Sequence, residues 1–204
     1  MKKLLLSSLI FLLIYGCSEE NTPTPIPDSV PQLTIGDFYK GGKIAYILQL
    51  GDPGYISGEQ HGIIAAISDF DVDQYQDLVK WWNGSYTNTG ATGELIGTGK
   101  VNTDKIIASQ GNTGFYAAKL CADYSVIENG ITYDDWYLPS RNELYMLYLN
   151  KTTNDGFSTG SYWSSTESGN DAVFCLFDYG NSTNVHFGYN DKEAGGRVRA
   201  IRAF

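Results

Sequence analysis

Hydrophobic residues fill one stretch near the start of the chain almost completely, and elsewhere they alternate with polar residues. The filled stretch covers residues 4–15 and follows Lys2 and Lys3. It is too short to anchor a chain across a bilayer, which takes roughly 20 apolar residues. It fits the apolar core of a cleaved export signal, so residues 1–16 are predicted to be a signal peptide.

Apolar residues in short runs, with β-branched and aromatic side chains, predict strands at both ends of the remaining chain. The first run, 43–50, follows a glycine turn, and a second run, 62–67, should pair near it. Later runs are separated by turns rich in Gly, Asn and Asp. These later strands are expected at 162–165, 172–179, 185–189 and 198–204.

Helical spacing of apolar residues appears between these two groups of strands. Asn102 is expected to cap a short helix over 103–109 that ends before Gly111, and a longer helix is expected over 113–124. The buried face of the longer helix would hold Ala117, Leu120, Cys121 and Tyr124.

A third helix has the clearest start signal in the chain. Ser140 and Glu143 have the spacing of a capping box, in which each side chain binds the other residue's backbone N–H. Leu144, Leu147 and Tyr148 then give an apolar stripe. The order of strands, then helices, then further strands predicts an α+β fold.

The signal segment ends in Ile14-Tyr15-Gly16-Cys17, which resembles the lipobox of bacterial lipoproteins. The resemblance implies cleavage after Gly16 and a lipid on Cys17, which would anchor the protein to a membrane. The acidic residues Glu19 and Glu20 resemble the surface-export signal of Bacteroidota lipoproteins, so we expect an outer-membrane lipoprotein displayed on the cell surface, with the periplasmic face as the alternative.

Residues 17–33 are predicted to be a tether and residues 34–204 a single domain. Four of the six prolines lie in the tether, where they favour extended conformations. The remaining length is sufficient for one domain with its own core.

Charge excludes one class of partner. The chain carries 14 basic and 23 acidic residues, a net charge of −9, whereas nucleic-acid binding depends on clustered Lys and Arg. The one basic cluster, Arg197, Arg199 and Arg202, alternates with apolar residues and is equally explained as part of a strand. We therefore expect no nucleic-acid partner.

Two cysteines remain once Cys17 is assigned to the lipid. Cys121 and Cys175 would mature in an oxidising compartment, where a remaining pair usually forms a disulfide. A disulfide between them is expected, and two buried thiols are the alternative.

Several motifs together resemble the Lcl C-terminal domain family, named for a collagen-like bacterial adhesin. The resemblance covers most of residues 38–204. The matching segments are 135–144, 162–167, 172–177 and 197–202, with glycines at 41–42, 62, 97 and 99. It implies a C-type-lectin-like fold, with two main helices on a looped antiparallel sheet, and it implies that the disulfide links helix to sheet.

Loops near the second family motif are the expected ligand-binding surface, since loops on a rigid scaffold often carry recognition. The alternative is that the tryptophans of the motifs, Trp136 above all, belong to the core. The predicted ligand-binding residues are Trp163, Glu167, Asn170, Asn181 and Asn184.

Acidic residues between 69 and 77 are the best candidates for a metal site. Asp69, Asp71, Asp73 and Asp77 begin with the spacing of an EF-hand loop, but Gln74 and Lys80 replace its essential glycine and final acid. A solvated acidic loop is the favoured interpretation and an irregular calcium site the alternative, so no cofactor is expected.

Catalytic signals are weak, because the chain has two histidines and no nucleophile motif. An oxidase similar to formylglycine-generating enzymes would need Cys121 and Cys175 to be reactive, whereas their expected positions are buried. We therefore expect a non-enzymatic surface lipoprotein that binds a glycan or a host or matrix protein in adhesion. A structural subunit of a surface or fimbrial assembly, with homo-oligomers, is the main alternative.

Overall fold

The computed structural model describes residues 32–70, 78–151, 156–169, 171–177 and 186–204; for 173–177 and 186 only the backbone is described. Gln32–Phe204 forms one unit. The predicted signal peptide, Cys17 and most of the tether lie outside the described residues, so those predictions stay untested. In the described part of the chain, no helix is long and apolar enough to cross a membrane.

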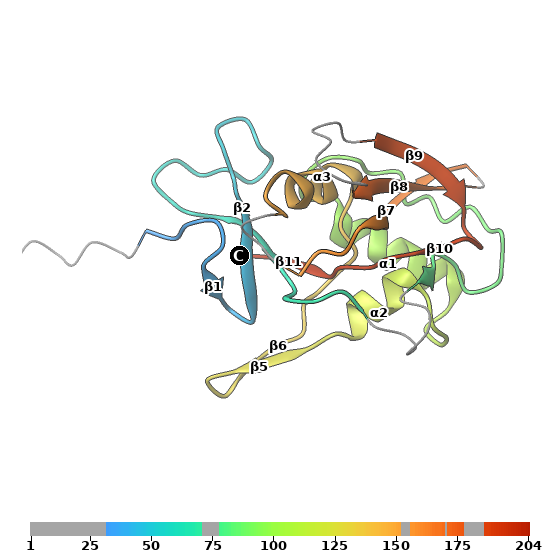
Figure 1. Cartoon of the computed structure of the whole chain (residues 1–204), viewed down its shortest axis with the longest axis horizontal. Coiled ribbons are helices and arrows are strands. Elements are labelled where there is room, and N and C mark those ends of the chain that lie inside the picture. The colour runs from blue at the N-terminus through green and yellow to red at the C-terminus, as the bar shows by residue number, and fades with distance from the viewer. Residues whose placement is uncertain (1–31, 71–77, 152–155, 170, 178–185) are drawn as a thin grey trace, which may run out of the picture. The chain divides into compact units, whose positions relative to one another are not determined.

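The first sheet joins the two ends of the described unit (Figure 1). Its strands are β1 (Phe38–Tyr39), β2 (Gly42–Ile47), β3 (Gly62–Ala65) and β11 (Ile201–Ala203), antiparallel in that order. β3 is buried along its whole length because β2 and β11 flank it on both sides. The strands predicted at 43–50 and 62–67 are confirmed, but they end earlier than predicted, at Ile47 and Ala65.

The second sheet contains β7 (Gly160–Ser168), β8 (Asp171–Phe177) and β9 (His186–Asp191), again antiparallel and in that order. These strands confirm the predictions for 162–165, 172–179 and 185–189. The last predicted strand, 198–204, is shorter than expected and belongs to the first sheet as β11.

Two further strand pairs were not predicted from the sequence. β4 (Val79–Lys80) pairs with β10 (Gly195–Gly196), and β5 (Val126–Glu128) forms a hairpin with β6 (Ile131–Tyr133). The hairpin turns at Asn129 and Gly130, which both have positive φ, 50° and 78°. An Asn-Gly turn between apolar residues is a strong hairpin signal, so this element could have been predicted.

Residues between β10 and β11 connect the two sheets. The Arg197 N–H donates to the Ser161 carbonyl over 2.8 Å, and the Trp163 N–H donates to the Arg197 carbonyl over 3.0 Å. Further along, Tyr137 and Ile201 exchange both backbone hydrogen bonds, at 2.8 and 3.0 Å. The end of the chain therefore holds the second sheet, the segment before the third helix and the first sheet together.

The first two helices begin differently from the prediction. α1 (Gly99–Gln110) begins earlier than expected, with Thr98 as its N-cap. Asn102 is not a cap: it is buried inside the helix, and its amide accepts from the Gly93 N–H and donates to the Gly93 carbonyl. α2 (Ala117–Asp123) is shorter than predicted because Tyr116 has an extended backbone, φ −148°.

The third helix confirms the start signal. α3 (Arg141–Leu149) has Ser140 as its N-cap, and both hydrogen bonds of the capping box with Glu143 are formed. Leu144, Leu147 and Tyr148 are buried, as the apolar stripe predicts.

α1 and α3 cover opposite faces of β7, because neighbouring residues of a strand point to opposite sides. Tyr162 belongs to a core cluster with Leu144 and Leu147 of α3, whereas Trp163 belongs to a cluster with Ile106 of α1. The described part of the domain therefore contains two hydrophobic clusters, which meet at this strand.

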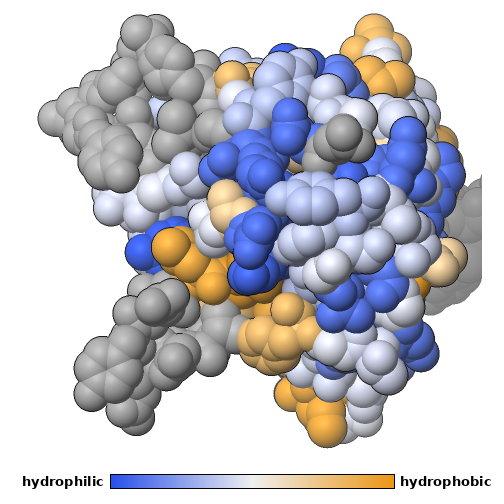
Figure 2. Space-filling model, turned by 90° about the vertical axis from the view of Figure 1, so that its right-hand side faces the viewer, coloured by the Kyte–Doolittle hydropathy of each residue, from blue (hydrophilic) through white to orange (hydrophobic). Residues whose placement is uncertain are grey.

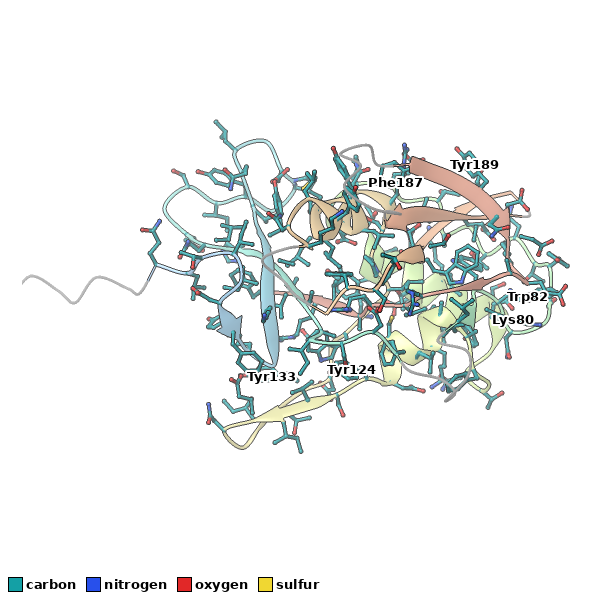
Figure 3. All side chains as sticks on the ribbon, in the orientation of Figure 1. Lys80, Trp82, Tyr124, Tyr133, Phe187 and Tyr189 are labelled. Atoms are coloured by element: carbon teal, nitrogen blue, oxygen red, sulfur yellow. The ribbon has the colours of Figure 1, made fainter. Side chains whose placement is uncertain are left out.

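Four tryptophans of the described residues are buried in the larger cluster, Trp82 among them, and the indole N–H groups of the other three donate to backbone carbonyls. The bonds run from Trp81 to Ser164 (2.8 Å), from Trp163 to Val79 (2.7 Å) and from Trp136 to Tyr133 (2.9 Å). Tyr124 and Tyr133 lie at the ends of α2 and β6 (Figure 3), and both contact Trp136. The Tyr124 ring packs edge-on against the Trp136 ring, with 5.0 Å between the ring centroids. The interpretation of Trp136 as a core residue is confirmed.

Cys121 is a buried thiol of α2, and the described residues contain no disulfide. Burial raises the pKa of this thiol well above its usual range, so its reactive thiolate form is scarce at neutral pH. The backbone of Cys175 pairs with Tyr162 and Phe187 in the second sheet. Its side chain lies outside the described residues, so the disulfide stays a prediction.

The α+β class is confirmed by three helices and several antiparallel sheets in the described residues. Polar residues cover most of the face seen in Figure 2, and the apolar residues there form smaller groups between them.

Candidate functional site

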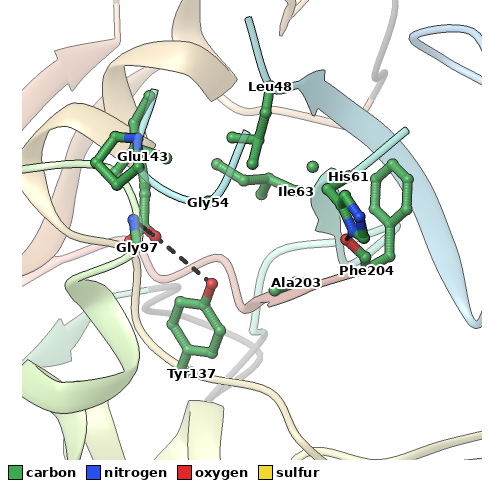
Figure 4. Close-up of a pocket in the computed structure, with 12 residues that line it drawn as sticks. Leu48, Gly54, His61, Ile63, Gly97, Tyr137, Glu143, Ala203 and Phe204 are labelled. Atoms are coloured by element: carbon green, nitrogen blue, oxygen red, sulfur yellow. Dashed lines mark hydrogen bonds between the residues drawn. The ribbon is translucent and has the colours of Figure 1, made fainter. Parts of the chain in front are cut away.

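A cavity of about 230 Å³ lies between the first sheet and the start of α3 (Figure 4). Six parts of the chain line it: the connection between β2 and β3, the start of β3, the segment before α1, the segment leading into α3, the first turn of α3, and the end of β11 with the residue after it. The lining residues are Leu48, Pro53, Gly54, His61, Gly62, Ile63, Ile96, Gly97, Tyr137, Glu143, Ala203 and Phe204.

The connection between β2 and β3 is held in place by its own hydrogen bonds. The Leu48 N–H donates to the His61 carbonyl over 2.8 Å. The Asp52 carboxylate accepts from the Gln49 N–H and from the Tyr46 hydroxyl, both over 2.7 Å. These contacts fix the segment that carries Leu48, and so they fix this wall of the cavity.

Gly62 lies where the strands approach too closely for a side chain. A Cβ at this position would lie 2.0 Å from the Tyr46 carbonyl oxygen. Only glycine therefore fits between β2 and the cavity, which explains why the residue after His61 has no side chain.

Glu143 is the buried acid of the cavity, with 1 % of its surface exposed. One carboxylate oxygen accepts from the Ser140 N–H over 2.7 Å, and the other accepts from the Gly97 N–H over 2.9 Å. Burial raises the pKa of the carboxyl above its ordinary value, although these N–H donors act in the opposite direction.

Tyr137 lies beside this acid, with its hydroxyl 3.5 Å from a carboxylate oxygen of Glu143 (Figure 4). Burial raises the pKa of the Tyr137 hydroxyl well above its usual range, and the charge of Glu143 adds to the effect. The hydroxyl is therefore protonated at neutral pH and can donate one hydrogen bond and accept another.

His61 closes the opposite side of the cavity, next to Phe204 (Figure 4). Its Nε2 lies 2.8 Å from a Glu59 carboxylate oxygen, and its Nδ1 lies 3.2 Å from the Phe204 carbonyl oxygen. Both ring nitrogens therefore have partners already.

The cavity has mainly apolar walls and one polar end, formed by Tyr137 and Glu143. Ligand sites commonly combine such walls with a few fixed polar groups, although cavities for drug-sized ligands are larger, at roughly 300–1,000 Å³. This arrangement can hold one side chain or another small group. Its titratable residues already serve as structural hydrogen-bond partners.

The prediction that Trp163 and Glu167 belong to a ligand-binding surface is wrong, because both residues are buried, with 1 % and 4 % of their surface exposed. The Glu167 carboxylate accepts from the N–H groups of Thr89 and Gly90 and lies 2.5 Å from Lys192 Nζ, itself fully buried. Removal of Glu167 would therefore affect folding. Asn170, Asn181 and Asn184 lie outside the described residues.

Of the four acidic candidates for calcium, the structure describes only Asp69. Asp69 forms a largely buried ion pair with Arg199, 2.6 Å apart, and also accepts a hydrogen bond from the Tyr162 hydroxyl. Asp71, Asp73 and Asp77 lie outside the described residues. In the part of the chain that is described, no group of three His, Cys, Asp or Glu residues could hold a metal ion.

The expected basic cluster does not form a surface patch. Arg199 is buried against Asp69, and Arg202 pairs with Asp135 over 2.6 Å while its guanidinium lies over the Tyr133 ring. Both arginines therefore serve as packing and pairing residues at the end of the chain.

Sequence patterns alone did not reveal the cavity. Glu143 was identified only as a capping residue, and Tyr137 only as part of a family motif. The nearest available signal was His61-Gly62, where a polar residue and a glycine begin a buried strand.

No protein-family model matches this chain, and a comparison with curated proteins finds no similar sequence. The site therefore has to be interpreted from its own geometry.

Proposed function

We propose that this chain is a bacterial surface lipoprotein, anchored in the outer membrane through a lipid on Cys17, whose domain binds a ligand and catalyses no reaction. Support for export and lipidation comes from the apolar run at 4–15 and the small residue before Cys17. The ligand would be a glycan or a protein of the host or matrix, and the role would be adhesion.

The cavity carries this proposal. Its walls are mainly apolar, and its titratable groups are already occupied: Glu143 by two backbone N–H groups, and His61 by Glu59 and a carbonyl. Groups held in this way suit the positioning of a ligand better than proton transfer, which needs a group free to exchange its proton with a substrate.

The domain is proposed to have a C-type-lectin-like arrangement and to be a divergent relative of the Lcl C-terminal domain family. In support, the two sheets are antiparallel, and the helices precede the second sheet in sequence. Tryptophans of both family motifs, Trp136 and Trp163, are core residues, as expected of residues that define a fold.

A binding array tests the proposal. The chain from residue 17 onward, with Cys17→Ser to prevent lipidation, is applied to immobilised glycans and matrix proteins, with calcium and with a chelator. A reproducible ligand is expected. Loss of that ligand in the chelator would add a calcium site to the proposal.

A variant that fills the cavity distinguishes binding at this site from binding elsewhere on the surface. Ala203→Trp fills the cavity from the exposed end of β11, and Ala108→Trp places the same side chain on the exposed side of α1. Ala203→Trp should abolish binding and Ala108→Trp should preserve it. Equal binding by both variants would contradict the assignment of the cavity.

A second candidate, a structural subunit of a surface assembly, is favoured by the β5–β6 hairpin. Ile127 and Ile131 near its tip are 73 % and 56 % exposed, and exposed apolar side chains in one place often mark an interaction surface. Concentration-dependent oligomers in analytical ultracentrifugation, abolished by Ile127→Ser with Ile131→Ser, would support this function. A monomer at all concentrations would contradict it.

A further inference from the structure

We infer that the cavity binds the side chain of a lysine on a protein ligand, with the ammonium group at Tyr137 and Glu143. This inference rests on the proposed function and names the chemistry that the site would recognise. Its basis is the unusual electrostatic position of one acid.

Glu143 is a buried acid for which the described residues supply no cation. Buried Glu167 and half-buried Asp69 are both paired: Glu167 lies 2.5 Å from Lys192, and Asp69 lies 2.6 Å from Arg199. No salt bridge is formed to Glu143 in the described ranges, and the cavity lining contains neither lysine nor arginine. A buried charge usually has an opposite charge beside it, and here the space next to the carboxylate is open.

An acceptor for an ammonium group is present at the polar end, beside a negative charge. The Tyr137 hydroxyl can donate toward Glu143, 3.5 Å away, and still accept a hydrogen bond from a ligand. The Glu143 carboxylate already accepts from the N–H groups of Ser140, Gly97 and Gly99 and from the Tyr137 hydroxyl, so it contributes its negative charge to this end. An ammonium brings both a donor for the Tyr137 oxygen and a positive charge, and therefore matches this end better than a carboxylate or a neutral hydroxyl does.

The walls suit the remainder of a lysine side chain. Lysine carries its charge on an apolar stem that packs along apolar surface. Leu48, Ile63 and Ile96 provide such a surface between the mouth of the cavity and the acid. Together, an apolar wall and a terminal acid match a stem with a terminal cation.

Electrostatics over a longer range also favours a cation. The chain has a net charge of −9. Asp52 and Glu59 lie in the connection that forms one wall of the cavity, and Glu59 contacts His61 of the lining. Negative charges around an opening raise the local concentration of positive ligands.

Three probes of similar length test the inference on the non-lipidated chain, from residue 17 with Cys17→Ser. They are n-pentylamine, 1-pentanol and pentanoate, titrated while backbone amide shifts are followed by NMR. Pentylamine should bind about tenfold more tightly than pentanol, as a hydrogen bond between charged groups implies, and pentanoate should bind most weakly. The largest shifts should occur at Gly62, Gly97 and Ala203, which line the cavity.

Two variants and a control test whether the preference for the amine over the alcohol arises at Tyr137 and Glu143. Glu143→Gln should abolish the preference for the amine and retain pentanol binding, with the fold checked by circular dichroism because this variant loses a backbone hydrogen bond. Tyr137→Phe keeps that hydrogen bond and should reduce the preference. Glu193→Gln removes an exposed charge outside the cavity lining and should leave the preference unchanged.

The source of the amine is tested with Nα-acetyl-lysine methylamide and its norleucine counterpart. The lysine compound should bind with the same preference, whereas binding of pentylamine alone would overturn a protein lysine as the ligand. Equal binding of pentylamine and pentanol to the unmutated chain would overturn the inference and leave the proposed binding function intact. Failure of every probe to bind would overturn the inference and the assignment of ligand binding to this cavity, while the array still tests the proposed function.

Discussion

Two buried glutamates in this domain have opposite surroundings. Glu167, on β7, has Lys192 beside its carboxylate and backbone N–H groups from Thr89 and Gly90. Burial alone would raise the pKa of Glu167, but Lys192 and Thr89 lower the pKa below its ordinary value. Glu143, in the first turn of α3, accepts only neutral donors, and its pKa is raised by burial.

The comparison separates a closed structural network from an open site. At Glu167 all of the partners come from the chain, and Lys192 has no exposed surface. At Glu143 the chain supplies hydrogen bonds but no charge, and the adjoining space is a cavity. A buried charge that remains uncompensated is costly, so an acid left in this state next to open space identifies where a ligand would bring its own charge.

The largest effect is expected from Lys192→Met, which retains the length of the side chain and removes its charge. Glu167 would then be a buried anion without a cation, and the free energy of unfolding should fall by about 3–5 kcal/mol. Urea denaturation followed by circular dichroism measures this loss.

The control for this prediction is Lys80→Met. Lys80 and Glu193 form an exposed ion pair, 3.5 Å apart, so its loss should cost less than about 1 kcal/mol. The double variant Glu167→Gln with Lys192→Met should recover much of the stability. Equal costs for Lys80→Met and Lys192→Met would show that the Glu167 network is not closed.

Glu143→Gln is expected to have the next largest effect on stability. Both carboxylate oxygens accept from backbone N–H groups, of Gly97 and Ser140, and glutamine can replace only one of these acceptors. A buried N–H left without a partner costs about 1–3 kcal/mol. Thermal unfolding measures the loss, and an unchanged melting temperature would contradict the hydrogen-bond arrangement.

Ser140→Ala tests the cap that positions Glu143. The Ser140 hydroxyl accepts from the Glu143 N–H and donates to the Leu95 carbonyl over 2.9 Å. Loss of an N-cap serine costs about 1 kcal/mol. The same urea titration checks this value; Ser140→Thr, which keeps a hydroxyl, should cost less than Ser140→Ala.

The smallest effects are changes of these costs with pH, and the two acids should behave oppositely. The folded-state pKa of Glu143 is raised, so its contribution to stability is present below the unfolded pKa and is lost as pH rises through the folded pKa. Glu143→Gln should therefore cost more near pH 4 than at pH 7.

Glu167 has a lowered folded-state pKa, so its contribution is present above the unfolded pKa and is lost as pH falls through the folded pKa. Glu167→Gln should therefore cost more at pH 7 than in acid. Urea titrations of both variants from pH 3 to pH 7 measure the two trends. Parallel trends would contradict the contrast between the acids.

Local signals in the sequence predicted the secondary structure well where a short motif determined it. The capping box at Ser140 and Glu143 fixed the start of α3, because both of its hydrogen bonds are made within four residues. The start of α1 was predicted too late, because Asn102 was interpreted as the cap of the helix. In the structure Asn102 lies inside the helix, and its side chain forms hydrogen bonds with Gly93, outside the helix. No local pattern could show that this side chain is part of the core.

The predicted ligand face failed for a similar reason. Trp163 and Glu167 lie in a motif that has the same appearance whether its residues face solvent or the core. The structure buries both, since Lys192 and Val79 approach from distant parts of the chain and supply their partners. Their burial depends on contacts that the motif itself does not contain.

By itself, the sequence determined the α+β order of elements, the start of α3 and most strand positions, because these depend on residues close together in the chain. Only the tertiary structure decided which of the buried acids has a cation and which adjoins a cavity. Lys192, the residue after β9, lies beside Glu167, whereas Tyr137, Ile63 and Ala203 line the space beside Glu143. The charge balance of a buried group is set by neighbours distant in sequence, and folding alone brings those neighbours together.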